Sequence, residues 1–230
     1  AVGRIAGERT ARRLGARPLA TIECPVIFEA PEAVDLVGAF VQAVSGGSLY
    51  RRSSFLLDSL GTPVFAPHVT IREEPHLARA RGSAPFDAEG VATSPRTVVD
   101  RGTVSGYFLG SYSARKLGLA TTANAGGSHN LVVSHGDDDL EGLMRRMGRG
   151  LLVTEQLGSG VNGVTGDYSR GAAGFWVDGG EIAHPVEEVT VAGNLKDMFR
   201  DIVAVGRDVD TRGARHVGSM LVGRMTVGGR

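Results

Sequence analysis

The histidines are the side chains of this sequence best suited to hold a catalytic metal ion. A helical zinc site for hydrolysis needs two histidines about one turn apart, a neighbouring glutamate that activates water, and a third ligand from another segment. None of the six histidines is followed by glutamate, and the closest two, His129 and His135, belong to an expected strand and the turn after it. The sequence therefore predicts no zinc helix.

A glycine-rich segment at 160–176, GVNGVTGDYSRGAAGFW, carries polar side chains suited to binding an extended peptide. A peptide cleft needs strand edges, close backbone approach and a few fixed side chains, because main-chain hydrogen bonds supply most of the affinity. Tyr168 and Arg170 could anchor a peptide carbonyl or carboxylate. Alternatively, the glycines mark bulges and Arg170 pairs with Asp167 or with an acid of another subunit. The candidate peptide-binding residues are Thr165, Gly166, Asp167, Tyr168, Ser169 and Arg170.

Two further polar groups lie in expected loops. His129 follows Asn124 and a Gly-Gly-Ser run, which could form a small polar site in a peptide chamber, and a hydrogen-bonded structural histidine is the alternative. Arg51 and Arg52 follow a glycine pair and could bind an anion, although this pattern is also typical of an exposed turn. No Gly-x-Ser-x-Gly pattern is present, which argues against a serine hydrolase.

The overall composition restricts the class of partner. Lysine plus arginine number 25, aspartate plus glutamate number 25, and no dense basic run is present, so nucleic acid is not expected as a main partner. No stretch approaches the ~20 apolar residues of a membrane span. The single cysteine, Cys24, cannot form an internal disulfide. We therefore expect a cytoplasmic protein with no membrane contact.

The N-terminal half is expected to contain two longer helices. Residues 2–16 have helical spacing and end at Pro18, and residues 31–45 repeat valines at helical spacing before a glycine pair ends the helix. The other elements expected here are a strand at 20–29 broken at Pro25, short β-like runs at 55–57 and 68–72, a hairpin at 97–109 and a helix at 111–118.

The C-terminal half is expected to be mainly strands. Three aspartates at 137–139 precede an amphipathic helix whose arginines lie toward its C-terminal end, in agreement with the helix macrodipole. Asn194 is expected to cap a second helix, which presents Leu195 and Ile202 on one face. The expected strands are a meander at 151–156, 161–168, 171–178 and 181–191, followed by 217–222 and 225–227.

Several segments resemble the TldD/PmbA family of metalloproteases, and more narrowly its PmbA (TldE) branch. The resemblance is carried by GDYSRGAAGFW at 166–176 and GNLKDM at 193–198, and upstream by GGSLYRRSSFLLD at 46–58, PFDAEG at 85–90, SYSARKLG at 111–118 and NAGGSHN at 124–130. It covers nearly the whole chain.

The pattern of elements predicts an α+β fold, mainly antiparallel β-sheet with a few amphipathic helices, and the resemblance implies that the sheet closes like a barrel. Members of the family carry a further N-terminal domain. The resemblance therefore implies that residues 1–18 are the tail of a helix from a missing N-terminal domain, and that 19–230 form a PmbA/TldE-like central and C-terminal β-rich domain.

The TldD branch carries its zinc ligands on a helix in the pattern His-Glu-x-x-x-His. The matching helix here keeps Glu32 but has Pro31 and Leu36 at the two histidine positions. The third ligand of the family, a distant cysteine, has no counterpart, because Cys24 is the only cysteine. The resemblance thus implies that this chain holds no metal and no catalytic residue, and that the zinc belongs to a TldD-type partner in a heterodimer.

Two functions follow from these observations. The resemblance implies a subunit of a cytoplasmic zinc metalloprotease that binds and helps cleave extended or unfolded peptides. The alternative is a non-catalytic binding or regulatory module that acts independently of proteolysis, for example on an enzyme that acts on nucleic acid.

Overall fold

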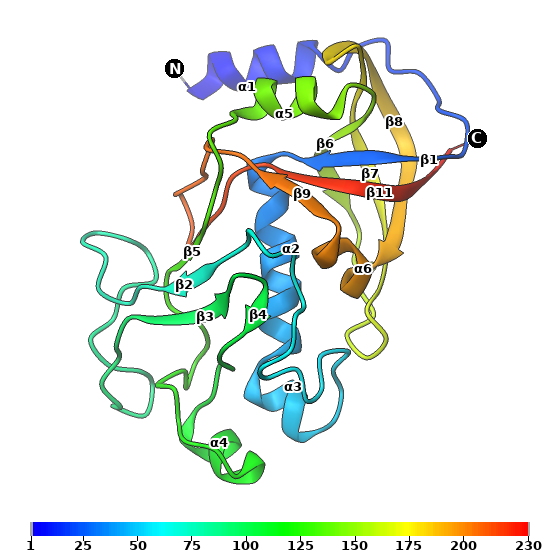
Figure 1. The fold of residues 1–230 in the computed structure, drawn as a ribbon. Coiled ribbons are helices and arrows are strands. Elements are labelled where there is room, and N and C mark those ends of the chain that lie inside the picture. Colours follow the sequence, from blue (N-terminus) through cyan, green and yellow to red (C-terminus); the bar gives the residue numbers. More distant parts are fainter. Residues whose placement is uncertain (1, 230) are drawn as a thin grey trace.

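The computed structural model describes residues 2–229, and the larger of its two sheets closes into a barrel (Figure 1). This sheet consists of β1 (Ile22–Phe28), β6 (Gly150–Leu157), β7 (Asp167–Asp178), β8 (Glu181–Asn194), β11 (Met220–Gly228) and β9 (Ile202–Val205). The strands pair in that order, and β1 also pairs with β11, so five strands form a ring that β9 extends. The β1–β6 pair is parallel and the other pairs are antiparallel. The predicted α+β fold with a barrel-like antiparallel sheet is confirmed.

The second sheet consists, in order, of β10 (Arg215–His216), β5 (Leu131–Val133), β2 (Ile71–Glu73), β3 (Arg96–Asp100) and β4 (Thr103–Val104). β3 and β4 form the hairpin predicted at 97–109. Gly102 is required at its turn, because a Cβ atom there would lie 2.4 Å from the carbonyl oxygen of Phe65.

Helix α2 (Ala30–Ala43) runs between the two sheets (Figure 1). Pro31 lies in its first turn, where the missing N–H donor costs no intrahelical bond. Phe40 is fully buried and packs edge-on against Phe65 with ring centroids 5.0 Å apart. The other helices are α1 (Val2–Ala11), α3 (Gly46–Tyr50), α4 (Ser111–Leu117), α5 (Leu140–Met147) and α6 (Leu195–Arg200).

Alternation along the barrel strands produces a core on each face of the sheet. In β1, Val26 and Phe28 join the main core around α2, whereas Ile27 between them joins a second cluster on the opposite face. Helix α5 covers that opposite face with Leu143 and Met144. The central helix and the barrel wall are therefore fixed by burial on both sides.

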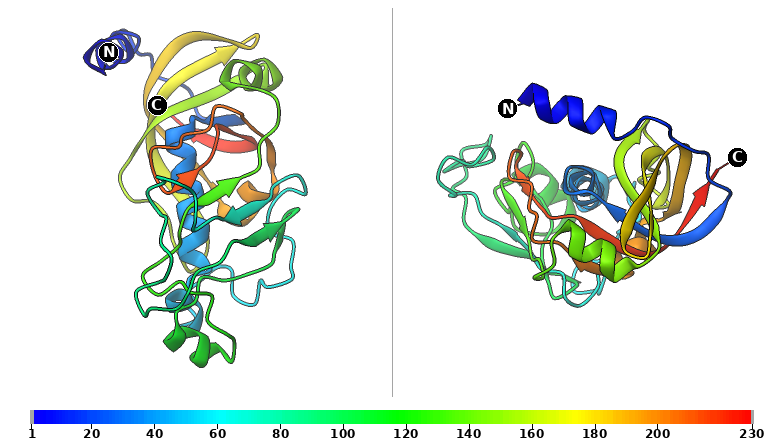
Figure 2. Two further views of the ribbon diagram at one scale, coloured as in Figure 1. Left: turned by 90° about the vertical axis from the view of Figure 1, so that its left-hand side faces the viewer. Right: turned by 90° about the horizontal axis from the view of Figure 1, so that it is seen from above.

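Helix α1 lies along the outside of the barrel (Figure 2), and none of its side chains is buried. Arg9 pairs with Glu29 at 3.2 Å, and the Arg12 guanidinium lies 5.4 Å from the ring centroid of Phe175. The assignment of 1–18 to a helix of another domain, and of 19–230 to one β-rich domain, stays a prediction; residues 1 and 230 lie outside the described residues.

Some local predictions are wrong. The glycine pair at 46–47 does not end the chain's helical structure but begins α3, because Ser45 caps it by accepting from the Ser48 N–H at 3.4 Å. Of the strand predicted at 161–168, residues 161–166 form a loop and β7 begins only at Asp167, because the Asn162 side chain accepts from the N–H of Val164 at 3.0 Å and turns the chain. In addition, 55–57 forms turns, Ile202 begins β9 instead of extending α6, and 220–227 run through the single strand β11.

Within residues 2–229, no helix is long and apolar enough to cross a membrane.

Candidate functional site

Helix α2 and strands β6 and β7 bring five polar side chains together, which we call the α2–β7 cluster: Glu32, Asp35, Gln156, Tyr168 and Arg170. The Tyr168 hydroxyl donates to Oε1 of Gln156, and Nε2 of Gln156 donates to the backbone carbonyl of Glu32 at 3.1 Å. Arg170 donates from Nη1 to the same Gln156 oxygen at 3.2 Å and to the Asp35 carboxylate at 2.7 Å. The cluster links the first turns of α2 to the wall of the barrel.

Tyr168 is only 3% exposed and packs edge-on against Phe28, with ring centroids 6.2 Å apart. Burial raises the pKa of Tyr168, although the nearby Arg170 guanidinium opposes that shift. The phenol is therefore a neutral donor whose proton already goes to Gln156. In this conformation Tyr168 positions other members of the cluster and has no free donor for a peptide.

Arg170 binds three acceptors through its two terminal nitrogens. Besides Asp35 and Gln156, it donates from Nη2 to the Gly158 carbonyl at 2.8 Å. Its Nε is buried and has no acceptor among the described residues. The acid that pairs with Arg170 is therefore Asp35 of α2, and the alternative pairing with Asp167 is wrong.

Glu32 lies in the first turn of α2 with its carboxylate partly buried. Burial raises the pKa of Glu32; Gln156 opposes the shift by hydrogen bonding, and the Asp35 charge adds to it. The Arg170 guanidinium pairs with Asp35, one helical turn further along α2.

The predicted residues Thr165, Gly166 and Asp167 tie the loop before β7 to the start of α6. The Thr165 hydroxyl donates to Asp167 at 2.6 Å, and the Asn194 side chain donates to the same carboxylate at 3.1 Å. These two hydrogen bonds lower the pKa of Asp167. Gly166 has φ +85°, and a Cβ there would lie 3.1 Å from the Phe55 ring. The polar groups of Thr165 and Asp167 thus form hydrogen bonds within the chain. Peptide contact by these residues stays a prediction.

Ser169 is exposed on β7, and its backbone N–H donates to the Gly160 carbonyl at 2.7 Å. Gly174, further along the strand, is required for strand packing: a Cβ there would lie 1.8 Å from the Leu152 carbonyl oxygen of β6. The ladder is irregular at this point, with register shifts next to Gly174. At Gly174, the interpretation of the glycines as bulge positions holds.

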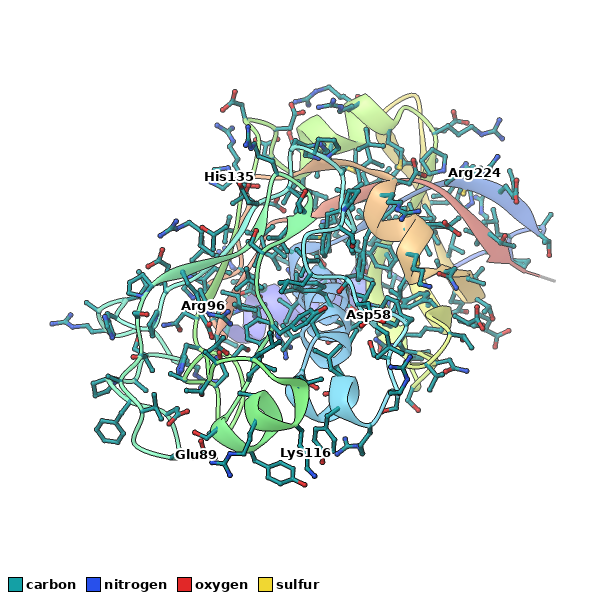
Figure 3. All side chains as sticks on the ribbon, turned by 60° about the horizontal axis from the view of Figure 1, so that its bottom comes forward. Asp58, Glu89, Arg96, Lys116, His135 and Arg224 are labelled. Atoms are coloured by element: carbon teal, nitrogen blue, oxygen red, sulfur yellow. The ribbon has the colours of Figure 1, made fainter. Side chains whose placement is uncertain are left out.

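His129 belongs to a different part of the molecule, which we call the Glu73 network: Glu73, Arg96, Asn124 and His129. The buried Glu73 carboxylate accepts from Arg96 Nε at 2.7 Å, from Asn124 Nδ2 at 2.7 Å and from the His129 backbone N–H at 2.8 Å. Nε2 of His129 lies 3.0 Å from the Ala123 carbonyl oxygen. Arg96 lies with the second sheet, across α2 from α6 (Figure 3). The structure thus does not bring His129 to the α2–β7 cluster.

A pocket of about 390 Å³ opens beside the α2–β7 cluster. Asp35 and Arg170 line it on the cluster side, Arg51 and Phe55 on the side of α3 and the turn after it, and Val161 on the side of the loop before β7. Its size lies in the range of small-ligand sites, and its lining mixes charged and apolar side chains. Of the predicted peptide-binding residues, Arg170 lines this pocket.

The first turns of α2 do not fit a zinc ion. Pro31 has no ligating side-chain atom, and Leu36 is 2% exposed within the core. Burial raises the pKa of Cys24 to about 11, which keeps its thiol protonated, whereas metals bind the thiolate. In the described part of the chain, no three His, Cys, Asp or Glu side chains are arranged to hold a metal ion. Glu32 therefore stands on this helix without the ligands that a zinc site needs.

The sequence identified Tyr168 and Arg170 as site candidates and Glu32 only as the remainder of the zinc pattern, and it missed Asp35 and Gln156. Asp35 follows Glu32 by three residues on α2, so both side chains share one helix face, and that spacing was the available signal. Gln156 lies near the end of an expected strand and gave no signal, because only the β6–β7 pairing brings it to Tyr168.

A protein-family model described as PmbA/TldA metallopeptidase C-terminal domain matches residues 21–229. Metalloprotease PmbA of Escherichia coli O157:H7 is 50% identical over 229 residues, which is 100% of this chain and 51% of that protein. The PmbA homologue of Haemophilus influenzae is 48% identical over 99% of this chain and 51% of its own length. The chain thus spans about half the length of the curated relatives it matches.

Solved structures share the fold. A Bacteroides thetaiotaomicron protein, solved as a candidate modulator of DNA gyrase, superposes with a TM-score of 0.95 at 33% identity over 99% of this chain and 52% of that one. TldE of Thermococcus kodakarensis has the same fold, with a TM-score of 0.83 at 21% identity over 98% of this chain and 55% of its own. From the match over 21–229 and the 50% identity to a PmbA protein, the chain belongs to the PmbA/TldD metallopeptidase family.

Proposed function

We propose that this chain is part of a non-metal subunit of a heteromeric cytoplasmic zinc metalloprotease, in which a TldD-type partner holds the zinc and cleaves the peptide. The observation that carries the proposal is the composition of α2. It keeps Glu32 of the His-Glu-x-x-x-His pattern, but Pro31 and Leu36 replace the two ligands. Hydrolysis by a metal-bound water needs three protein ligands, so the metal must come from elsewhere in the assembly.

The side chains around Glu32 support a binding role in place of a hydrolytic one. The Arg170 guanidinium pairs with the Asp35 carboxylate, so a fixed cation belongs to the cluster. The pocket beside the cluster and the loop before β7 then form the surface that receives extended or unfolded peptide. Thr165, Gly166, Asp167 and Ser169 shape that surface through the loop. Arg170 lines the pocket, and Tyr168 positions Gln156 next to it.

The test uses the full-length protein with and without a TldD-type partner and an unfolded peptide. We expect no cleavage by the protein alone and cleavage by the mixture, with EDTA abolishing it. The mixture is also made with a partner variant in which the glutamate next to the zinc ligands is replaced. Loss of cleavage in that mixture shows that the partner activates the water. Cleavage by this protein alone that EDTA abolishes would contradict the proposal.

A second candidate function is a binding or regulatory module that does not take part in proteolysis. It is favoured by one observation: two structural relatives at 33% and 34% identity were solved as candidate modulators of DNA gyrase. The balanced charge of this chain argues against direct DNA contact, so such a module would bind protein. Native mass spectrometry separates the two functions, because a protein that remains monomeric in the presence of the zinc subunit favours the module.

A further inference from the structure

The pocket of about 390 Å³ beside α2 carries an unbalanced positive charge. Its charged lining residues are Asp35, Arg170 and Arg51. Asp35 and Arg170 neutralise each other at 2.7 Å. Arg51 is exposed and makes no ion pair with any described residue within 4.0 Å. One unpaired cation therefore faces the cavity.

Aromatic contacts hold this cation in place. The Arg51 guanidinium lies 5.2 Å from the ring centroid of Tyr50 and donates to the Tyr50 hydroxyl at 3.1 Å. Tyr50 in turn packs edge-on against Tyr112 of α4 at 5.6 Å, and the Lys116 ammonium lies 5.7 Å from the Tyr112 ring centroid. Lys116 stands on α4, at the end of the molecule opposite α1 (Figures 1 and 3). Because the rings restrain it, Arg51 loses less freedom when it binds an anion.

The rest of the pocket suits a peptide. Phe55 and Val161 line it with apolar side chains from two sides, and Val161 is 42% exposed. The loop that carries Val161 is held to the opposite wall by a bond from the Phe55 N–H to the Gly163 carbonyl at 2.9 Å. Arg170 lines the pocket too, but its guanidinium is already committed to Asp35, Gln156 and the Gly158 carbonyl. The pocket therefore offers an exposed cation, Arg51, beside apolar side chains.

We propose that this pocket binds the carboxylate of an extended peptide, with Arg51 as its direct partner. The inference rests on the proposed function, because it names what that peptide site recognises. A peptide offers this group at its C-terminus or on an acidic side chain, and both would pair with a guanidinium in the same way. Arg51 sits at the rim, so the carboxylate meets it while the preceding side chain lies on the Phe55 wall.

The experiment measures the affinity of the full-length protein for three fluorescein-labelled unfolded peptides by anisotropy at low salt. One has a free C-terminal carboxylate, one is amidated, and one is amidated with an internal glutamate. We expect amidation to weaken binding about two- to fivefold, the scale of one exposed charged pair, and added salt to reduce the difference. Recovery with the internal glutamate would show that an acidic side chain supplies the carboxylate; no recovery would assign it to the C-terminus.

The variant Arg51→Gln should bind the free and amidated peptides equally. Arg52→Gln is the matched control: Arg52 is also exposed but does not line the pocket, and it has φ +55°, which glutamine tolerates as well as arginine does. The control should keep the preference for the free carboxylate. Thermal unfolding of both variants checks that they fold like the parent.

Equal binding of free and amidated peptides by the parent protein overturns the inference. So does an unchanged preference in Arg51→Gln, or the absence of any peptide binding. Cleavage by the mixture with the TldD-type partner is recorded in parallel. If the mixture cleaves while amidation has no effect, the inference fails and the proposed function stands. If the mixture does not cleave, the proposed function fails.

Discussion

The Glu73 network and the α2–β7 cluster contain similar side chains but differ in how completely these are paired. In the Glu73 network, the 1% exposed carboxylate accepts three hydrogen bonds, and Arg96 also reaches Asn124 at 3.1 Å. In the α2–β7 cluster, Asp35 is half exposed, one donor of Arg170 has no acceptor, and a pocket adjoins. A polar network that satisfies itself holds the fold, whereas one with spare groups beside a cavity can bind a ligand.

The largest expected effect comes from breaking the Glu73 network. Glu73→Gln removes the charge that Arg96 pairs with and places an amide group against the donors of Asn124 and His129. We expect the free energy of unfolding to fall by about 3 kcal/mol, as for other buried pairs that lose one partner. Urea unfolding measures it, with Glu74→Gln as the more exposed control. A loss below that of the control would show that the network does not stabilise the fold.

His129 tests whether the Glu73 network is purely structural, because its residue type suggested a functional site. His129→Phe removes the ring contact to the Ala123 carbonyl but keeps an aromatic ring and the backbone bond to Glu73. We expect a loss of about 1 kcal/mol in the free energy of unfolding and unchanged peptide affinity. Unchanged stability together with lost peptide binding would place His129 in the site.

These two cases show what the sequence could and could not predict. Helix α2, the β3–β4 hairpin, α5 with its Asp139 cap and α6 with its Asn194 cap follow from spacing and end signals, which act locally. The partners of His129 and Arg170 lie 56 and 135 residues away, in Glu73 and Asp35. Pairings over such distances depend on the register between sheets and helices, which no local pattern encodes.

The loop before β7 is a second place where a local sequence pattern predicted the wrong structure. Its alternating residue types favour a strand at 161–168, but the Asn162 side chain accepts from the N–H groups of Val164 and Thr165 and stabilises a turn. Side-chain competition of this kind is invisible to a periodicity argument. The resulting loop forms one wall of the pocket, so the error falls at the candidate site.

Asp35→Asn should separate stability from binding in the α2–β7 cluster. It removes the ion pair to Arg170, and because Asp35 is half exposed we expect the free energy of unfolding to fall by only about 0.2–1 kcal/mol. It also removes the negative charge from the pocket lining, so affinity for a peptide carboxylate should rise. Calorimetric unfolding and anisotropy measure the two effects on one preparation. A fall in affinity would mean that Asp35 itself contacts the peptide.

The smallest expected effect is on the pH dependence of stability. Burial raises the pKa of Glu32 above its ordinary 4.5, so the folded state holds this proton more tightly than the unfolded state. The stability that the protonated group contributes is complete below pH 4.5 and is lost as pH rises through the folded pKa. Between pH 4.5 and the folded pKa of Glu32, the free energy of unfolding should therefore fall less steeply with rising pH in Glu32→Gln than in the parent protein. A decline of the same steepness in parent and variant would contradict the assignment.

The most direct test of the central claim is the zinc content of the full-length protein, alone and with its TldD-type partner. Elemental analysis combined with native mass spectrometry assigns the metal to a subunit. With Pro31 and Leu36 at the ligand positions, we predict no stoichiometric zinc in the protein alone and zinc in the complex, held by the partner. Stoichiometric zinc that stays with this protein through dialysis, and is lost in Glu32→Gln, would contradict the account.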